Sequence, residues 1–505
     1  MPTRALSELR SGVSILLALS FASVNRKLEA NATEATPNLD CDAPSISCCP
    51  NFAIEERMSR HTNLCPTVRP SPRQSKSFGS WLVGLTIATL QLVATAAMLR
   101  GDNEIDTTTD QPTLVVDADF ANGNGRIESI DQRTRTIRMS PTEHKQRGWA
   151  CWWYVKVTGI RAGETVTLDV GKAPWATPAQ AAYSLDNQNW CQTNRGTQDK
   201  DRIVYRQRID ASEAWFAWGP PFTVADANAL TEWASGRIPQ TRKIDLVRTR
   251  GGQVIPAIRV GAKPAGAARS SESPPTPQPI NGRPYTIWIQ ARQHAWEAGS
   301  SWVCKGLINW LASDDPRAES LRSMSQLVIV PIMDVDNVLL GAGGKNQAPH
   351  DHNRDWSDAP HWPAVRAAIA EIRGLDRDGR FDVFIDLHNP GPRDDAPFFF
   401  VTPRELLTDK GRRNLQRLLA TAQAEITGPL AFAGESRESG PNYDKEWRRI
   451  SKNWVSLNTR GHVVAVTLET AWNSPSSTIG GYETVGRQLG LALERYLRTN
   501  PRQDD

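Results

Sequence analysis

Short runs in which apolar and polar residues alternate fill residues 113–218 of this 505-residue chain. They include TLVVDADF, RIESIDQRTRTIRM, ETVTLDVG and IVYRQRI, with Gly, Asp and Asn at the breaks between them. Alternation of this kind is typical of strands that face a core on one side and solvent on the other. Several such strands in succession predict an antiparallel β-sandwich domain over 113–218.

A different pattern begins after residue 218 and continues to residue 500. Near-continuous apolar runs predict buried strands at residues 285–291, 327–332, 381–387 and 463–468. Helical stretches are expected between and after them, at residues 301–313, 362–374, 404–425 and 482–498. Strands that alternate with helices predict an α/β domain over 219–500, with a mixed, largely parallel central sheet flanked by helices. The Pro/Ser-rich stretch 262–282 is expected to form a loop within this domain.

Two apolar stretches in the first 112 residues have the character of targeting signals. Residues 11–24 follow two arginines, whereas residues 80–99 follow further basic residues and end in small side chains. The second stretch is also long enough to span a bilayer once. We therefore expect residues 1–112 to be a poorly ordered leader and the protein to be exported to the periplasm or cell envelope. A membrane tether through 80–99, if that stretch is retained, and a cytoplasmic protein are the alternatives.

Charge and cysteine content narrow the class of protein. The net charge is +4, from 59 basic and 55 acidic side chains with no long block of one sign, so we expect no nucleic-acid partner. Four of the seven cysteines lie in the leader. Cys151 and Cys191 could form a disulfide in an exported protein, but the sequence alone does not establish their geometry.

Candidate metal ligands follow two of the predicted strands. His294 and Glu297 come directly after 285–291, and their HxxE spacing lets an imidazole and a carboxylate converge on one ion. Such pairs also arise by chance, so the spacing alone is a weak signal. His388 ends the strand 381–387, and open α/β sheets bind ligands where the carboxyl ends of strands meet. Two His and one Glu leave a fourth position for water, which is typical of a catalytic zinc site.

Further polar residues lie beside these candidates in the sequence. Asp386 either orients the His388 imidazole or is an ordinary buried polar group. Glu469 ends the strand 463–468, where a carboxylate is costly unless it is paired, solvated or functional. As a general base it would take a proton from the water that zinc activates; as a structural residue it would cap the next segment or pair with an arginine. Asn353 and Arg354 offer an amide and a planar fork suited to a carboxylate, or form a salt-bridged surface loop.

The motifs ARQHAWE, DHNRDW, DLH and TLET, in that order, resemble those of the zinc metallocarboxypeptidases. The greatest similarity is to the cytosolic-carboxypeptidase-like subgroup, which carries a β-sandwich ahead of the catalytic domain. DADFANGN and FAWGPPFT are similar to that front domain and to the hinge that follows it, so the resemblance covers roughly 113–499. It implies one zinc ion per chain and the following roles: His294, Glu297 and His388 as zinc ligands, Asn353 and Arg354 as binders of the terminal carboxylate, and Glu469 as the base.

The sequence also departs from the pattern of this family. An arginine is usual shortly before the NR pair, where it polarises the scissile carbonyl, but the nearest cation here is Lys345. Tyr443 is the candidate for the substrate-contacting tyrosine expected before the base. Eukaryotic members trim acidic tails and need cations in the specificity pocket. Arg448, Arg449 and Lys452 are candidates for these cations. A basic helix on the surface would explain the same three residues equally well.

The function that these observations favour is hydrolysis of the C-terminal peptide bond of peptides or protein tails. A catalytically weak zinc protein that binds peptide C-termini is one alternative. A zinc amidohydrolase or esterase acting on a non-peptide substrate is another. We expect the front domain to shape access to the cleft or to bind a partner.

Overall fold

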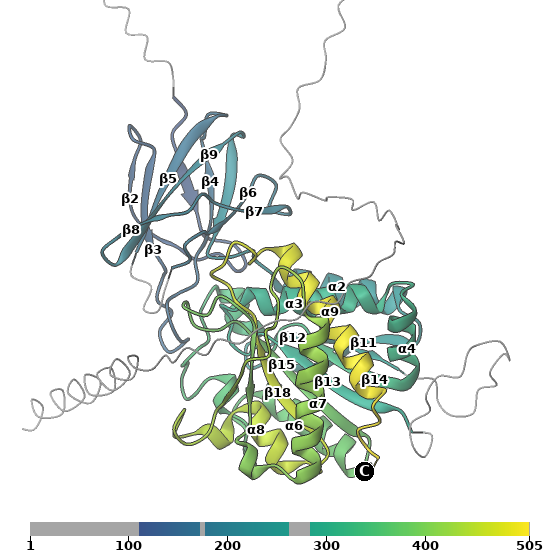
Figure 1. Cartoon of the computed structure of the whole chain (residues 1–505). Helices are drawn as coiled ribbons and strands as arrows, with labels where there is room; N and C mark the ends of the chain where they lie inside the picture. The colour runs from purple at the N-terminus through teal and green to yellow at the C-terminus, as the bar shows by residue number, and fades with distance from the viewer. Residues whose placement is uncertain (1–110, 172–176, 262–282, 504–505) are drawn as a thin grey trace, which may run out of the picture. The chain divides into compact units, whose positions relative to one another are not determined.

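The computed structural model describes residues 111–171, 177–261 and 283–503 (Figure 1). The two targeting-like stretches at 11–24 and 80–99, and the loop at 262–282, lie outside the described residues. Within the described ranges, no helix combines the length and apolar character needed to cross a membrane.

The N-terminal part of the described chain forms two five-stranded sheets, which we call the N-terminal sheet domain. The first sheet has the strand order β1 (Val115–Asp117), β4 (Tyr154–Thr158), β10 (Glu213–Ala217), β6 (Ala182–Ser184) and β7 (Trp190–Gln192). The second has the order β2 (Arg126–Asp131), β3 (Thr136–Ser140), β5 (Glu164–Gly171), β9 (Arg202–Ile209) and β8 (Thr197–Asp199). Neighbouring strands are antiparallel, except that β3 pairs with β5 in parallel.

One hydrophobic core joins these two sheets. Ile137 and Val166 from the second sheet belong to the same buried cluster as Val155 and Phe216 from the first, and all four are fully buried. Burial of each such side chain contributes roughly 1.5–3 kcal/mol to the hydrophobic term. The alternation therefore arises because the apolar side of each strand faces this core. The prediction of an antiparallel sheet domain ahead of an α/β domain is confirmed.

An eight-stranded mixed sheet forms the centre of the second domain. Its strand order is β11 (Thr241–Arg248), β12 (Val254–Val260), β14 (Ser325–Val330), β13 (Tyr285–Ala291), β15 (Phe381–His388), β18 (Val464–Glu469), β16 (Phe398–Val401) and β17 (Ser436–Glu438). The four central strands β14, β13, β15 and β18 are mutually parallel. They correspond to the four apolar runs and are buried almost throughout, as strands covered on both faces must be.

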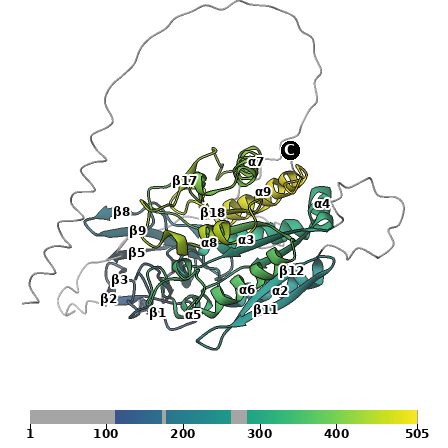
Figure 2. The same cartoon turned by 90° about the horizontal axis from the view of Figure 1, so that it is seen from below.

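Helices pack around this sheet (Figures 1 and 2). They are α2 (Val224–Arg237), α3 (Ala298–Leu311), α4 (Pro316–Met324), α5 (Val335–Leu340), α6 (Pro363–Arg377), α7 (Asp409–Glu425), α8 (Ser451–Asn458) and α9 (Ile479–Leu497). The four predicted helices correspond to α3, α6, α7 and α9. Helix α7 begins later than predicted because the Thr408 side chain accepts a hydrogen bond from Gly411 N and caps the helix there.

Helices α3 and α9 lie side by side in both views, and their contact fixes the start of α3. A Cβ atom on Gly486 of α9 would lie 1.9 Å from the Val303 carbonyl oxygen of α3, so only glycine permits this approach. Helix α3 begins directly after Glu297. Its packing therefore holds one of the candidate metal ligands in place.

Three adjacent parallel strands end at the same edge of the sheet. Strand β13 ends at Ala291, β15 at His388 and β18 at Glu469. Ala291 is in register with Leu387, and His388 is in register with Glu469. Groups that are far apart in the sequence therefore meet at the carboxyl edge, where open α/β sheets bind their ligands.

Candidate metal centre and substrate cavity

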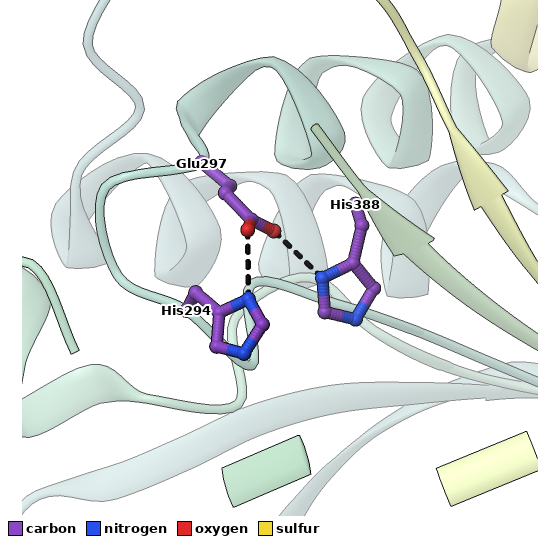
Figure 3. Close-up of side chains that lie close together, drawn as sticks. All are labelled: His294, Glu297 and His388. Carbon is purple, nitrogen blue, oxygen red and sulfur yellow. Dashed lines mark hydrogen bonds and ion pairs between the residues drawn. The ribbon is translucent and has the colours of Figure 1, made fainter. Parts of the chain in front are cut away.

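His294, Glu297 and His388 point toward one another at this edge (Figure 3). The Nδ1 atom of His294 lies 2.7 Å from Oε1 of Glu297, and the Nδ1 atom of His388 lies 2.7 Å from Oε2. All three side chains are buried, and their donor atoms lie within 4.8 Å of one another. This set offers two imidazole nitrogens and a carboxylate, the composition of a catalytic zinc site.

A buried arginine shapes the loop that carries the first two ligands. Arg292 has a positive φ of 64°, which is uncommon for a side chain other than glycine. Its guanidinium donates to the Ala295 carbonyl at 2.9 Å through Nε and to the Phe222 carbonyl at 2.8 Å through Nη1. Burial lowers its pKa to about 9. These bonds hold the turn between β13 and α3 in the shape that brings His294 back toward Glu297.

Carboxylates lie on the far side of both imidazole rings. The Nε2 atom of His388 is 2.9 Å from Asp386 Oδ2, which also accepts hydrogen bonds from Gln293 Nε2 at 2.5 Å and Ser451 Oγ at 2.6 Å. The Nε2 atom of His294 lies 3.6 Å from Asp351 Oδ1. At His388 the Asp386 acceptor on the outer nitrogen orients the ring so that its inner nitrogen faces the cluster. The separation between His294 and Asp351, in contrast, is beyond hydrogen-bond distance.

The charges around the cluster fit a bound cation. Burial alone would raise the pKa of Glu297, but the imidazoles of His294 and His388 lower it to about 2. Burial would lower the pKa of His388, yet Asp386 and Glu297 hold it well above its usual range. Burial likewise opposes ionisation of Asp351, while Lys345, His294 and Arg354 hold its pKa well below its usual range. The cluster thus concentrates carboxylates around two ring nitrogens, as a divalent cation requires.

Glu469 lies beside this cluster and is buried, and its Oε2 atom has no hydrogen-bond partner in the described structure. Burial raises its pKa to about 8; His388 and Lys345 oppose this rise, whereas Glu297 and Asp386 add to it. A buried carboxylate without a partner is costly unless it serves a ligand. Its position at the end of β18 places it where a general base for water would act.

A cavity of about 260 Å³ opens over the metal ligands and Glu469. The other predicted site residues that line it are Lys345, Asn353, Arg354, Tyr443 and Lys452. The structure therefore brings together the eight residues predicted as ligands, base or substrate contacts and, beside them, Lys452.

The amide and guanidinium predicted to bind a terminal carboxylate lie in a 3-10 turn at His352–Arg354. Asn353 accepts a hydrogen bond from Ser451 N at 2.9 Å, and its Nδ2 lies 3.4 Å from His388 Nε2. Arg354 donates through Nε to Asp444 Oδ2 at 2.8 Å. Asn353 therefore contacts one of the candidate metal ligands. The guanidinium of Arg354 lines the cavity and is fixed by its ion pair with Asp444.

Of the three cations considered for a specificity pocket, Lys452 alone lines this cavity. Its Nζ donates to Ser439 Oγ at 2.5 Å and to Asn453 Oδ1 at 2.7 Å, and its side chain is fully buried. Burial and the neighbouring Arg354 lower its pKa well below the usual range. Arg448 lies over the Trp447 ring, and Arg449 pairs with Glu446 at 3.3 Å.

Three further cavity or support residues were not identified from the sequence. Asp351 faces His294 and lies 3.3 Å from Lys345. Its place in the DHNRDW motif, directly before the NR pair, is a sequence signal that could have identified it. Arg437, which pairs with Asp394 at 2.9 Å, and Trp149 of the N-terminal sheet domain also line the cavity. Neither carries a local sequence signal, because only the tertiary fold brings them to the cleft.

Comparison with known families agrees with this arrangement. Residues 116–218 match the model of the cytosolic carboxypeptidase N-terminal domain, and residues 229–385 match the model of the zinc carboxypeptidases. Together the two matches cover just over half of the chain. The family suggested by the motifs is thereby confirmed.

Relatives and solved structures give the same result. Cytosolic carboxypeptidase 1 of Danio rerio is 27% identical over 59% of this chain, and cytosolic carboxypeptidase 6 of Caenorhabditis elegans is 24% identical over 56%. The matches span only 27% and 64% of those two proteins. A metallo-carboxypeptidase from Burkholderia cenocepacia covers 77% of this chain and 99% of its own length, with a TM-score of 0.64 and 20% identity. That likeness shows a shared fold.

One expectation needs correction, and one open question is answered. The prediction of an exported protein is wrong, because the N-terminal family model and the vertebrate relatives carry the name cytosolic carboxypeptidase. That prediction relied on the apolar stretches of the leader, which lie outside the described residues. The sequence left open whether Cys151 and Cys191 form a disulfide. They do not, since Cys151 is a free, buried thiol in the core of the N-terminal sheet domain.

Proposed function

Because the chain belongs to the zinc carboxypeptidase family, we propose that it is a metallocarboxypeptidase that removes C-terminal residues from peptides or protein tails. One observation carries the proposal. The buried carboxylate of Glu469, with an unpartnered oxygen, lies beside the His294–Glu297–His388 cluster in a cavity that also contains cations. Metal-assisted hydrolysis of a C-terminal peptide bond uses a base, a metal position and a positive charge for the substrate carboxylate.

Zinc held by His294, Glu297 and His388 would supply a Lewis acid that polarises the scissile carbonyl and makes water more acidic. Glu469 would take one proton from the attacking water and pass it to the nitrogen of the departing residue, so that the peptide C–N bond breaks with no net charge on the leaving amine.

Cations in the cavity would stabilise two negative charges, that of the substrate's terminal carboxylate and that which develops on the scissile carbonyl oxygen during the reaction. Arg354 would bind the terminal carboxylate, and Asp444 would keep its guanidinium in place. Lys345 would stabilise the negative charge that develops on the carbonyl oxygen, acting as a point charge in place of the arginine usual in the family. Tyr443, whose ring packs 5.0 Å from that of Phe400, would cover the bound residue.

The buried Lys452 supports a preference for an acidic C-terminal side chain. A fully buried lysine that lines a substrate cavity is costly to charge unless an anion approaches it. An aspartate or glutamate side chain would provide that anion. We therefore propose peptides that end in an acidic residue as the substrate class.

The arrangement of the chain supports two further assignments. We assign residues 113–218 to a β-sandwich domain, because its two sheets share one core, and residues 219–500 to the catalytic domain. We place the protein in the cytoplasm, in line with the names of its relatives.

Paired peptides that differ only at the C-terminus test the proposal. Each peptide should be offered as the free acid and as the C-terminal amide, with zinc and with a chelator, and the products read by mass spectrometry. We expect loss of single residues from the free acid alone, and only with metal. Equal hydrolysis of the amide would indicate an amidohydrolase instead.

A further inference from the structure

A loop of the N-terminal sheet domain runs beside a cavity-lining segment of the catalytic domain. This docking loop, residues 146–149, lies between β3 and β4, and the segment, residues 343–348, contains Lys345. Three backbone hydrogen bonds join them, from Trp149 N to Lys345 O at 2.9 Å, from Gly344 N to Arg147 O at 2.9 Å and from Ala348 N to Gln146 O at 3.0 Å. The bonds fix the backbone on both sides of Lys345.

Glycines make this close approach possible. Gly148 has a φ of 89°, and a Cβ atom there would lie 2.4 Å from the carbonyl oxygen of Lys345. From the other side, a Cβ atom on Gly343 would lie 2.1 Å from the carbonyl oxygen of Trp149. Any larger residue at either position would force the docking loop and the Lys345 segment apart.

On its other side the same segment contacts the loop that carries His294 and Glu297. Trp296 N, within the HAWE ligand loop, donates to the Gly343 carbonyl at 3.1 Å. The Nζ atom of Lys345 lies 3.3 Å from Asp351, the carboxylate that faces His294. Contacts therefore run from the N-terminal sheet domain through Lys345 to the ligand cluster.

We infer that the N-terminal sheet domain belongs to the catalytic machinery, because its docking loop positions Lys345 in the cavity. This inference rests on the proposed function for the role of Lys345. A lysine has a flexible stem and a point charge, so its effect on a reacting carbonyl depends on where its backbone is held. Gly148 acts through Lys345 and is a positioning residue.

A double-mutant cycle tests the inference in the full-length, zinc-loaded protein. The variants are Gly148→Ala, Lys345→Met and the two combined, with Gly159→Ala as the matched control. Gly159 lies in the same domain and also has a positive φ of 74°. A Cβ atom there would lie 1.9 Å from the Thr113 carbonyl, and the three atoms nearest to it belong to Thr113 and Leu114, not to the Lys345 segment. Gly343→Ala makes the same clash from the catalytic side and replaces Gly148→Ala if that variant fails to fold.

The expected result is a fall in kcat of about 10- to 100-fold for Gly148→Ala, since small displacements of catalytic groups have effects of this size. In the Lys345→Met background the same substitution should change kcat by less than about twofold, because coupled residues are not additive. Gly159→Ala should lower the melting temperature and leave kcat almost unchanged. The inference would be overturned if Gly148→Ala lowered kcat by the same factor in the wild type and in Lys345→Met. It would also be overturned if Gly159→Ala lowered kcat as much as Gly148→Ala does.

Hydrogen exchange gives a readout that does not depend on turnover. The amides of residues 343–348 should exchange faster in Gly148→Ala and at the wild-type rate in Gly159→Ala. Unchanged exchange in Gly148→Ala would overturn the positioning role. A wild-type protein that cleaves no peptide would contradict the proposed function, while exchange would still decide whether the docking loop holds the Lys345 segment.

Discussion

The Nε2 atom of His388 lies 2.9 Å from Asp386 Oδ2, on the side of the ring opposite the Nδ1 atom that faces Glu297. The two residues are separated by one position on β15, so both side chains leave the same face of the strand. Asp386 therefore fixes the ring orientation and the tautomer of His388 without itself reaching the metal position.

Replacement of Asp386 should weaken zinc binding. We expect Asp386→Asn to reduce zinc affinity about 10- to 100-fold, the usual effect of losing an outer partner of a ligating histidine. Competition with a chromophoric chelator measures the affinity. Asp382→Asn is the control, since Asp382 is a buried carboxylate on the same strand that pairs with Arg502 at 2.7 Å. Equal zinc affinity in the two variants would contradict the role of Asp386.

Replacement of Glu469 should abolish turnover while the metal site survives. Glu469→Gln removes the base but keeps the shape of the side chain, so kcat should fall about 10²- to 10⁴-fold. Zinc content should stay at the wild-type level, because Glu469 is not one of the three clustered ligands. Glu494→Gln alters a buried glutamate of α9 that pairs with Arg317, and it should retain activity. Undiminished hydrolysis in Glu469→Gln would refute the assignment of the base.

Replacement of Lys452 should change specificity more than overall activity. For peptides ending in Glu, Lys452→Gln should lower kcat/KM about 10- to 100-fold, the effect of a lost hydrogen bond to a charged group. Peptides ending in Leu should lose little. Arg448→Gln serves as the control, because Arg448 lies over Trp447 and does not line the cavity. The same loss for both peptides would exclude Lys452 as the specificity residue.

The preference for an acidic residue should also depend on pH. The pKa of Lys452 is lowered by burial and by Arg354, against the opposing effect of Asp386, Glu469 and Glu438. The side chain is therefore neutral above this lowered pKa, and an anionic substrate side chain binds its protonated form. Preference for Glu over Gln at the C-terminus should be greatest where Lys452 is protonated and the substrate Glu, with a pKa of about 4.3, is ionised, and it should fall as pH rises through the Lys452 pKa. The kcat/KM ratio of the two peptides measures it, and a pH-independent ratio in the wild type would contradict this prediction.

The metal ligands and the base could be predicted because each follows or ends a long apolar run. A run such as FDVFIDL fixes a buried strand, and a polar residue at its end must lie at a sheet edge. The parallel order of β13, β15 and β18 then brings His294, His388 and Glu469 together. The fold class was predictable for the same reason.

Other features depend on contacts that no local pattern specifies. Arg448, Arg449 and Lys452 lie within five positions of one another and look equivalent in the sequence. Only the turn at Trp447–Arg449 and the start of α8 direct Lys452 into the cavity and the other two away from it. The parallel pairing of β3 with β5, and the approach of Trp149 to Lys345, likewise arise from tertiary packing.

A zinc titration of the metal-stripped protein tests the central claim most directly, namely that His294, Glu297 and His388 form one metal site on which peptide hydrolysis depends. Zinc content and hydrolysis of a peptide ending in Glu should rise together and level off at one equivalent per chain. With one equivalent of zinc added, His388→Ala should neither bind zinc tightly nor hydrolyse the peptide. Hydrolysis before zinc is added, or full activity in His388→Ala, would contradict the claim.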